Sequence, residues 1–323
     1  MEAAELRPLS LGELLDRTFS LYRNNFWLFV GIMAIPASFG IPVNYLLLSF
    51  QGSMLSAPGK PPQMPSPGLI IGAAAGYFAY LILVITVYAI AVAAVTHAVS
   101  EAYLGRDSTV RASYRSIEGK FWRLIGVVFN VAIRIFGILM LVMMVVGGVG
   151  GVLIAATAAS TGQAVMAAAI GLFVILLYGF GIAAGVYLAL RYAVSIPALM
   201  LENLSVLAAV RRSVQLTRGR RGHIFIAFLL AWIVGLVGYI VFQAPFSIAT
   251  MIDVFSSRHL PTWLALATAV AGAVGGATTG PISMIVLVLC YYDTRIRKEA
   301  FDLQFMMASL DRPSPAAGAV PSA

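Results

Sequence analysis

Six apolar stretches, each long enough to cross a lipid bilayer, constrain the fold of this chain more than any other feature of its sequence. A hydrocarbon core of about 30 Å takes about 20 helical residues, and each stretch reaches that length. They are residues 26–50, 69–99, 135–157, 165–190, 224–245 and 263–292. Because no water reaches the backbone inside lipid, each stretch must satisfy its hydrogen bonds internally, which predicts a helix. We therefore expect an all-α, polytopic membrane protein with six transmembrane helices.

The composition agrees with lipid as the main solvent of the chain. Apolar residues make up 60% of the sequence and charged residues 11%, whereas about a quarter of the residues in a soluble domain are charged. These values exclude a soluble globule and a disordered chain. The single cysteine excludes a disulfide scaffold. A folded basic domain is also missing, so nucleic acid is not an expected partner.

The lysines and arginines indicate how the spans are oriented. Eighteen of the 21 flank the ends of the stretches on one side. They are Arg7, Arg17 and Arg23; Arg106, Arg111, Arg115, Lys120 and Arg123; Arg191, Arg211, Arg212, Arg218, Arg220 and Arg221; and Arg295, Arg297, Lys298 and Arg312. The opposite connections contain only Lys60 and Arg258. The positive-inside rule therefore predicts that both termini are cytoplasmic. The sequence has no organelle address, which favours the bacterial plasma (inner) membrane for this multi-pass protein.

Three cytoplasmic segments share a spacing in which a serine precedes an arginine by seven residues. The pairs are Ser10 with Arg17, Ser108 with Arg115, and Ser205 with Arg212. Serine is a favoured N-cap, so each segment is interpreted as a short amphipathic helix at the inner leaflet, followed by a membrane hairpin. This predicts one six-span domain (1–312) of three repeats, about 8–99, 106–190 and 203–292, with a disordered tail at 313–323. The alternative is that any inner-leaflet helix favours a capping serine and a snorkelling arginine.

The arginines of the inner surface are the candidate contacts for anionic lipid or for a protein partner in the membrane or cytoplasm, because each gains about 1 kcal/mol near anionic headgroups. They are Arg17, Arg115, Arg134, Arg211, Arg212, Arg218, Arg220 and Arg221. Arg134 is ambiguous. If its span begins at Ile125, the guanidinium lies deep and needs a partner such as a lipid phosphate, Glu101 or a backbone carbonyl. If the span begins at Ile135, Arg134 snorkels to the inner headgroups, and the cost of about 3 kcal/mol for a central arginine favours this second interpretation.

Catalytic and metal-binding patterns are not visible in the sequence. His97 and Glu101 lie one helical turn apart, but zinc takes three or four ligands, so two do not make a site. No serine–histidine–acid pattern is evident, and the spans lack carboxylates that could carry protons. We therefore expect no catalytic residue, no metal and no cofactor.

Three segments resemble a known family. They are RPLSLGELLDRTFSLYRNNF (7–26), ALMLENLSVLAAVRRSVQLTRGRRGHIF (198–225) and YYDTRIRKEAFDLQ (291–304). They are similar to the bacterial glycerophosphoryl diester phosphodiesterase membrane-domain family and its stand-alone relatives. In that family the membrane domain can be joined to a catalytic barrel. The 31 residues after Tyr292 are too few for a barrel of about 250 residues, so the resemblance implies a membrane protein that anchors, senses or passes something, without the activity of the barrel.

Three functions follow as hypotheses. The first is a non-enzymatic scaffold or accessory subunit in the bacterial inner membrane. The second is a permease or transporter component that moves a small solute or lipid, suggested by the repeated hairpins and by Pro36 and Pro42, which predict a kink or break in the first span. A polar cavity between the repeats would favour this second function, whereas a dry bundle would count against it. The third is an intramembrane enzyme that uses Arg134, His97 and Glu101.

Overall fold

The computed structural model describes residues 8–55, 67–103, 105–157, 163–257 and 261–299, and within these ranges the chain forms ten α-helices and no strand. They are α1 (Leu11–Asn24), α2 (Phe26–Leu55), α3 (Pro67–Tyr103), α4 (Val110–Arg115), α5 (Phe121–Thr157), α6 (Gln163–Tyr192), α7 (Ser195–Glu202), α8 (Val206–Thr217), α9 (Arg221–Ser257) and α10 (Thr262–Glu299). Six of them, α2, α3, α5, α6, α9 and α10, are long and apolar enough to cross a membrane. The all-α fold and the six candidate spans are confirmed, whereas the tail at 313–323 lies outside the described residues.

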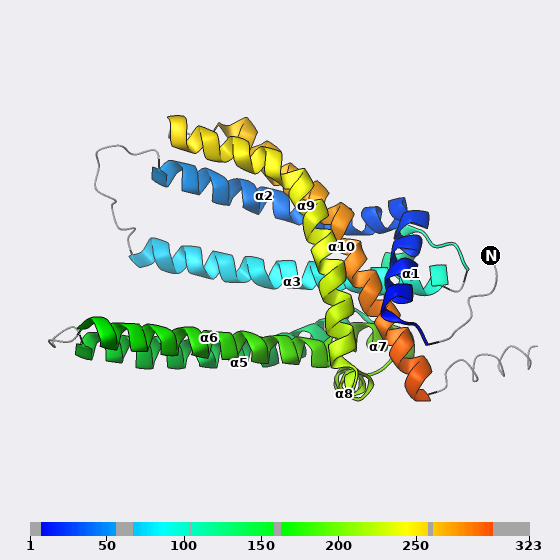
Figure 1. Cartoon of the computed structure of the whole chain (residues 1–323). Helices are drawn as coiled ribbons and strands as arrows, with labels where there is room; N and C mark the ends of the chain where they lie inside the picture. Colours follow the sequence, from blue (N-terminus) through cyan, green and yellow to red (C-terminus); the bar gives the residue numbers. More distant parts are fainter. Residues whose placement is uncertain (1–7, 56–66, 104, 158–162, 258–260, 300–323) are drawn as a thin grey trace, which may run out of the picture.

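Most of the buried core lies at one end of the molecule. Here the short helices α1, α4, α7 and α8 pack against the adjoining ends of the long helices (Figure 1). We call this end the hub. Its core contains Phe29, Leu124 and Ile224, each fully buried and each the fourth residue of its span. The spans α2, α5 and α9 are therefore anchored in the hub by their first turns.

Away from the hub the spans differ in how much of their surface is covered. The most apolar window of α10 is 56% buried, whereas the corresponding windows of α5 and α6 are 6% buried. α10 packs against α2 and α9 and is the central span. α5 and α6 pack mainly on each other, and away from the hub this hairpin stands apart from the other spans (Figure 1). Its exposed apolar side chains suit contact with lipid, which is as apolar as they are.

The structure extends two expectations about the spans. The third span lies on one continuous helix that begins at Phe121, ahead of the membrane stretch predicted from Ile135, and its first turns are packed into the hub core through Leu124 and Val127. Of the kink or break expected at Pro36 and Pro42, a break is not found, since α2 continues through both. A proline removes only one amide donor from the helix, and apolar packing on α10 supports the chain around it.

A short helix precedes each of α2, α5 and α9, as the serine–arginine spacing predicts. Ser10 and Ser205 are the N-caps of α1 and α8, and Ser10 forms a capping box with Glu13. The N-cap of α4 is Thr109 rather than Ser108, and its side chain accepts a hydrogen bond from the Ala112 amide at 3.2 Å. The hydroxyl of threonine also satisfies an orphan amide, so the cap is one residue later in this segment than the spacing indicates.

Glycines bring two of these short helices close to the first span of the preceding hairpin. A Cβ atom added at Gly31 of α2 would lie 2.9 Å from Val110 Cγ2, the first residue of α4. A Cβ atom added at Gly126 of α5 would lie 2.8 Å from Val206 Cγ2, the first residue of α8. Both glycines are the sixth residue of their span. The same contact therefore joins α2 to α4 and α5 to α8.

Candidate functional site

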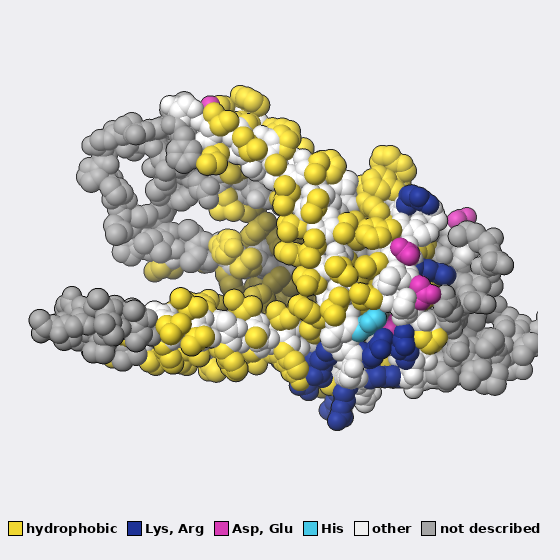
Figure 2. Space-filling model, in the orientation of Figure 1, with side chains coloured by type: hydrophobic (Ala, Val, Ile, Leu, Met, Phe, Trp, Pro, Cys, Tyr) yellow, Lys and Arg dark blue, Asp and Glu magenta, His cyan; other side chains and the backbone are white. Residues whose placement is uncertain are grey.

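Basic side chains gather at the hub, while hydrophobic side chains cover the long helices (Figure 2). Arg212 of α8 lies in an ion-pair network. Its Nε donates to Glu202 at 2.9 Å, and its Nη2 donates to Glu299 at 2.7 Å. Tyr291 also donates to Glu202, at 2.7 Å. The hydrogen bond with Glu299, and then that with Glu202, raises the pKa of Arg212 above its ordinary value, so this guanidinium stays charged.

A second network surrounds Asp293 of α10, whose side chain is only 1% exposed. The carboxylate accepts hydrogen bonds from Arg297 Nε at 2.9 Å, from Arg220 Nη2 at 3.3 Å and from the Leu9 amide at 3.0 Å. Arg297 also donates to the Leu9 carbonyl at 2.6 Å. The chain just before α1 is thus clamped to the end of α10.

Sequence reasoning did not single out the acidic partners in these networks. The sequence pattern that could have identified two of them is the four-residue spacing of Asp293 with Arg297 and of Arg295 with Glu299. This spacing places opposite charges on one helical face. Both pairs form ion pairs, at 2.9 Å and 3.3 Å. The partner Glu202 lies on α7, and no local pattern connects it with α10.

Two other predicted arginines pack on tyrosine rings. The Arg17 guanidinium carbon lies 4.9 Å from the centre of the Tyr103 ring. Arg221 lies 4.7 Å from the centre of the Tyr187 ring and donates to its hydroxyl at 2.6 Å. A cation over an aromatic face is attracted by the electrons of the ring, so these contacts hold α1 against α3 and α9 against α6.

Arg134 of α5 reaches Tyr192, the last residue of α6. Its Nη1 donates to the Tyr192 hydroxyl at 3.3 Å, whereas Glu101, a partner proposed from the sequence, pairs with Arg106 at 3.6 Å. Tyr192 lies closer to the hub than Tyr187, which contacts the first residue of α9. The side chain of Arg134 therefore extends toward the hub, and this placement supports the interpretation that it snorkels.

The remaining predicted contacts are exposed. Among the described residues, the Arg115 side chain pairs with Glu118 at the surface, at 3.7 Å and with both side chains 74% exposed. Arg211 and Arg218 are also exposed. A surface ion pair contributes little, so these three guanidinium groups are accessible to a partner. The predicted arginines thus divide into an exposed group and a group held in contacts within the protein.

The third hypothesis needs Arg134, His97 and Glu101 to converge. Arg134 and Glu101 instead have separate partners, as described above, and His97 Nδ1 is buried without a hydrogen-bond partner among the described residues. Within the same residues, no three His, Cys, Asp or Glu side chains gather as a metal site would require. This arrangement does not support the proposed enzyme site.

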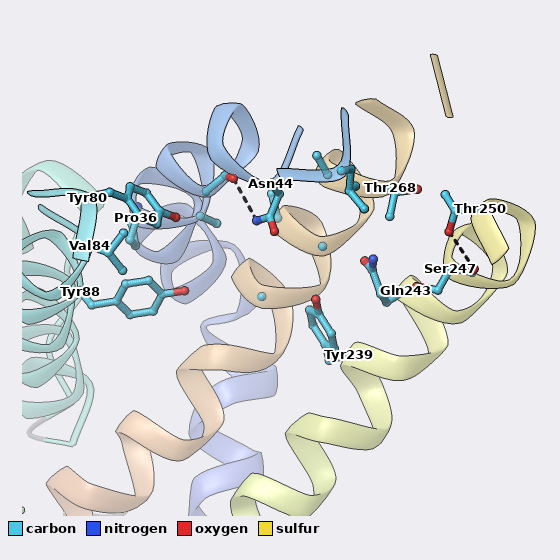
Figure 3. Close-up of a pocket in the computed structure, with 17 residues that line it drawn as sticks. Pro36, Asn44, Tyr80, Val84, Tyr88, Tyr239, Gln243, Ser247, Thr250 and Thr268 are labelled. Atoms are coloured by element: carbon cyan, nitrogen blue, oxygen red, sulfur yellow. Dashed lines mark hydrogen bonds between the residues drawn. The ribbon is translucent and has the colours of Figure 1, made fainter. Parts of the chain in front are cut away.

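A cavity of about 390 Å³ lies among α2, α3, α9 and α10, away from the hub (Figure 3). Tyr80, Tyr88 and Tyr239 contribute phenol rings, and Asn44 and Gln243 contribute amides. The other polar side chains on its wall are Ser247, Thr250 and Thr268. None of these described lining residues carries a charge. The molecule therefore contains a polar, uncharged hollow between its first and last long hairpins.

Some polar groups of this cavity lack a partner within the described part of the chain. The amide oxygen of Gln243 is buried and accepts no hydrogen bond there. By contrast, Asn44 donates to the Gly40 carbonyl at 3.0 Å, and Thr268 donates to the Leu264 carbonyl at 2.8 Å. A buried amide oxygen without a donor is costly. The sequence signal for this site is an amide side chain inside an apolar span, at Asn44 and at Gln243.

A dry cluster closes the cavity toward the hub. Met33, Ala37, Ala91 and Ala277 are buried together there, from α2, α3 and α10. Next to them, the methyl group of Met33 would lie 3.0 Å from a Cβ atom added at Gly280. Buried apolar packing of α2, α3 and α10 therefore lies between this hollow and the hub.

Comparison with known proteins finds a family match for the second half of the chain. A family model described as the membrane domain of glycerophosphoryl diester phosphodiesterase matches residues 172–307. No curated protein and no solved structure matches the chain. The match agrees with the six candidate spans, so the chain is a multi-pass integral membrane protein. The resemblance predicted from the sequence is confirmed over residues 172–307, which match the model of that membrane domain and include two of the three similar segments, 198–225 and 291–304, whereas segment 7–26 lies outside the match.

Proposed function

We propose that this protein is a non-enzymatic scaffold or accessory subunit of the bacterial inner membrane whose hub holds anionic lipid headgroups. The observation that carries the proposal is the exposed group of arginines at the hub, Arg115, Arg211 and Arg218. Trp27 and Trp122, each 81% exposed, lie at the second position of α2 and α5. Tryptophan favours the headgroup level of a bilayer, so these side chains mark the inner interface beside the arginines.

The hub is cytoplasmic in this proposal, and both termini lie on that side. The charge of the sequence supports it, because 18 of the 21 lysines and arginines lie in the sequence segments that the positive-inside rule places in the cytoplasm. Cys290, the single cysteine, is buried, so it gives a low background in labelling. We expect an impermeant maleimide added to intact cells to label Ser56→Cys and not Arg218→Cys. Labelling of both from outside would refute this orientation.

The three short helices and their hairpins are proposed to be repeats of one unit within a single domain. Counted from the caps Ser10, Thr109 and Ser205, the fourth and eighth following residues are buried in all three segments. They are Leu14 and Thr18, Ser113 and Ile117, and Ala209 and Ser213. The glycine–valine contacts of α2 with α4 and of α5 with α8 further support a common unit.

A lipid-retention experiment tests the proposed role. The purified protein in nanodiscs with phosphatidylglycerol and phosphatidylcholine should retain phosphatidylglycerol in native mass spectrometry. We expect the triple variant Arg115→Gln, Arg211→Gln, Arg218→Gln to lose most of this preference, because each guanidinium contributes about 1 kcal/mol. Arg258→Gln, on the opposite side, is the control. An equal preference in both variants would contradict the proposal, and hydrolysis of glycerophosphodiesters by the purified protein would contradict the non-enzymatic role.

A second candidate function is a transporter component, and the polar cavity favours it. Binding near the middle of the spans between repeats is the arrangement of many transporters. The uncharged lining suits a neutral solute, so proteoliposomes should take up labelled glycerol or sorbitol faster than protein-free vesicles. Uptake at the rate of the empty vesicles would count against this candidate.

A further inference from the structure

We infer that the cavity among α2, α3, α9 and α10 binds a neutral, polyhydroxylated group. Two sources share this chemistry, namely a free polyol or sugar and the sugar headgroup of a glycolipid. The inference deepens the second candidate function, since it names the ligand class of the same cavity. It requires binding and does not require transport.

The absence of charge on the described wall selects against ionic ligands. An ion taken out of water needs a counter-charge or metal, without which its burial is costly. In this cavity the described polar groups are hydroxyls and amides. The acidic residue nearest in sequence to the wall is Asp253 of α9, three residues after Thr250, and it is not among the lining residues. A phosphate or carboxylate would therefore find no partner of opposite charge among the described lining residues.

The hydrogen-bonding groups of the wall match hydroxyls. The buried oxygen of Gln243 requires a donor, and the hydroxyls of Tyr80, Tyr88 and Tyr239 can donate or accept. None of these hydroxyls is bonded to another described residue. A polyol presents several groups that both donate and accept, so one ligand can satisfy Gln243 and the tyrosines together. In Figure 3 Tyr88 points toward α10 from α3, and Tyr239 and Gln243 point toward it from α9.

The size and the aromatic surface of the cavity agree with a sugar-sized group. Its volume of about 390 Å³ is within the range of small-molecule pockets. The tyrosine rings add flat apolar surface with a polar tip, against which the C–H face of a sugar can pack. The wall thus offers both polar groups and apolar surface, as binding of a carbohydrate requires.

Two glycines of α10 shape the site. A Cβ atom at Gly272 would lie 3.2 Å from Gln243 Oε1 and 3.4 Å from the Tyr239 hydroxyl, so the glycine allows both groups to approach the helix. A Cβ atom at Gly276, one turn later, would meet nothing within 4 Å. A side chain introduced at Gly276 therefore enters open space beside the cavity without forcing the backbone to move.

The binding test uses one probe for each source. Saturation-transfer NMR with methyl β-glucoside measures the free sugar on protein in phosphatidylcholine nanodiscs, and native mass spectrometry measures retention of monoglucosyl diacylglycerol from doped nanodiscs. Binding of only one probe identifies the source and supports the inference. No binding of either probe would overturn it.

Variants separate binding in the cavity from binding elsewhere. Gly276→Leu should abolish binding, and Gln243→Leu should weaken it about tenfold, the effect of one lost hydrogen bond. Gly137→Leu is the matched control, because Gly137 of α5 also has nothing within 4 Å of an added Cβ atom and lies outside the cavity. If Gly276→Leu and Gly137→Leu bind equally well, and both have the melting temperature of the wild type, the cavity is not the binding site. Binding without solute flux would refute the transporter candidate alone.

Discussion

Replacing Gly126 with alanine should separate the contribution of one helix contact from that of helix propensity. The added Cβ would lie 2.8 Å from Cγ2 of Val206, 3.6 Å from its Cγ1 and 3.8 Å from its Cβ. Carbon atoms prefer about 3.5–4.0 Å, so one of the two helices must shift. Valine is stiff about its first side-chain torsion, and the ion pairs of Arg212 hold α8 in place. Overpacking of this kind costs about 1–3 kcal/mol.

The control for this change is Gly137→Ala on the same helix, where an added Cβ meets nothing within 4 Å. Both variants gain the same helix propensity, about 1 kcal/mol. The difference between their free energies of unfolding, measured by titrating SDS into dodecylmaltoside micelles, should therefore be about 1–3 kcal/mol. Adding Val206→Ala to Gly126→Ala should recover most of the lost free energy of unfolding. Equal stability of the Gly126 and Gly137 variants would refute the reasoning.

Three further predictions concern the hub. Asp293→Asn should lower the free energy of unfolding by about 3 kcal/mol, because it leaves two arginines without their buried counter-charge, whereas the exposed control Asp16→Asn should have little effect; similar values for the two would contradict the clamp. Arg134→Leu should leave a folded monomer on size-exclusion chromatography, since its contact with α6 is at the hub side; loss of that monomer would show that Arg134 is required deep in the span. Burial raises the pKa of Tyr114 to about 12, above its ordinary value of about 10, so the unfolded chain releases this proton first and stability falls between these pH values. Tyr114→Phe, which also loses the 2.7 Å hydrogen bond to the Ile32 carbonyl, should show a smaller fall over that window; an equal fall would contradict the assignment.

The spans and the short inner helices could be predicted from the sequence because their signals are local. Twenty apolar residues in a row require a helix in lipid, whatever the rest of the chain does. The serine–arginine spacing likewise identified α1, α4 and α8, although the cap at Thr109 differs by one residue. The helix of the third span begins before the predicted membrane stretch because hydropathy reports the bilayer, whereas the first turns of α5 are covered by protein around Leu124.

The partners of the arginines could not be predicted, because they come from distant parts of the chain. Arg212 pairs with Glu202 and Glu299, and only the packing of α7, α8 and α10 brings these three together. The cavity has the same origin. Gln243 stands out as an amide in an apolar span, but its proximity to Tyr88 depends on how α3 and α9 lie around α10.

The two ends of α10 bear on the choice between the two candidate functions. Its hub end is held by the ion pairs of Asp293 and Glu299, and breaking a buried pair costs about 3–5 kcal/mol. Its other half lines the cavity with Gly272 and Gly276, and the buried cluster around Met33 lies between the cavity and the hub. Alternating access by rocking of one repeat against another would have to move the hub and break these pairs. A ligand could instead enter the cavity while the hub stays fixed, so the arrangement favours a scaffold or accessory subunit that binds a neutral group over one that moves it across the membrane.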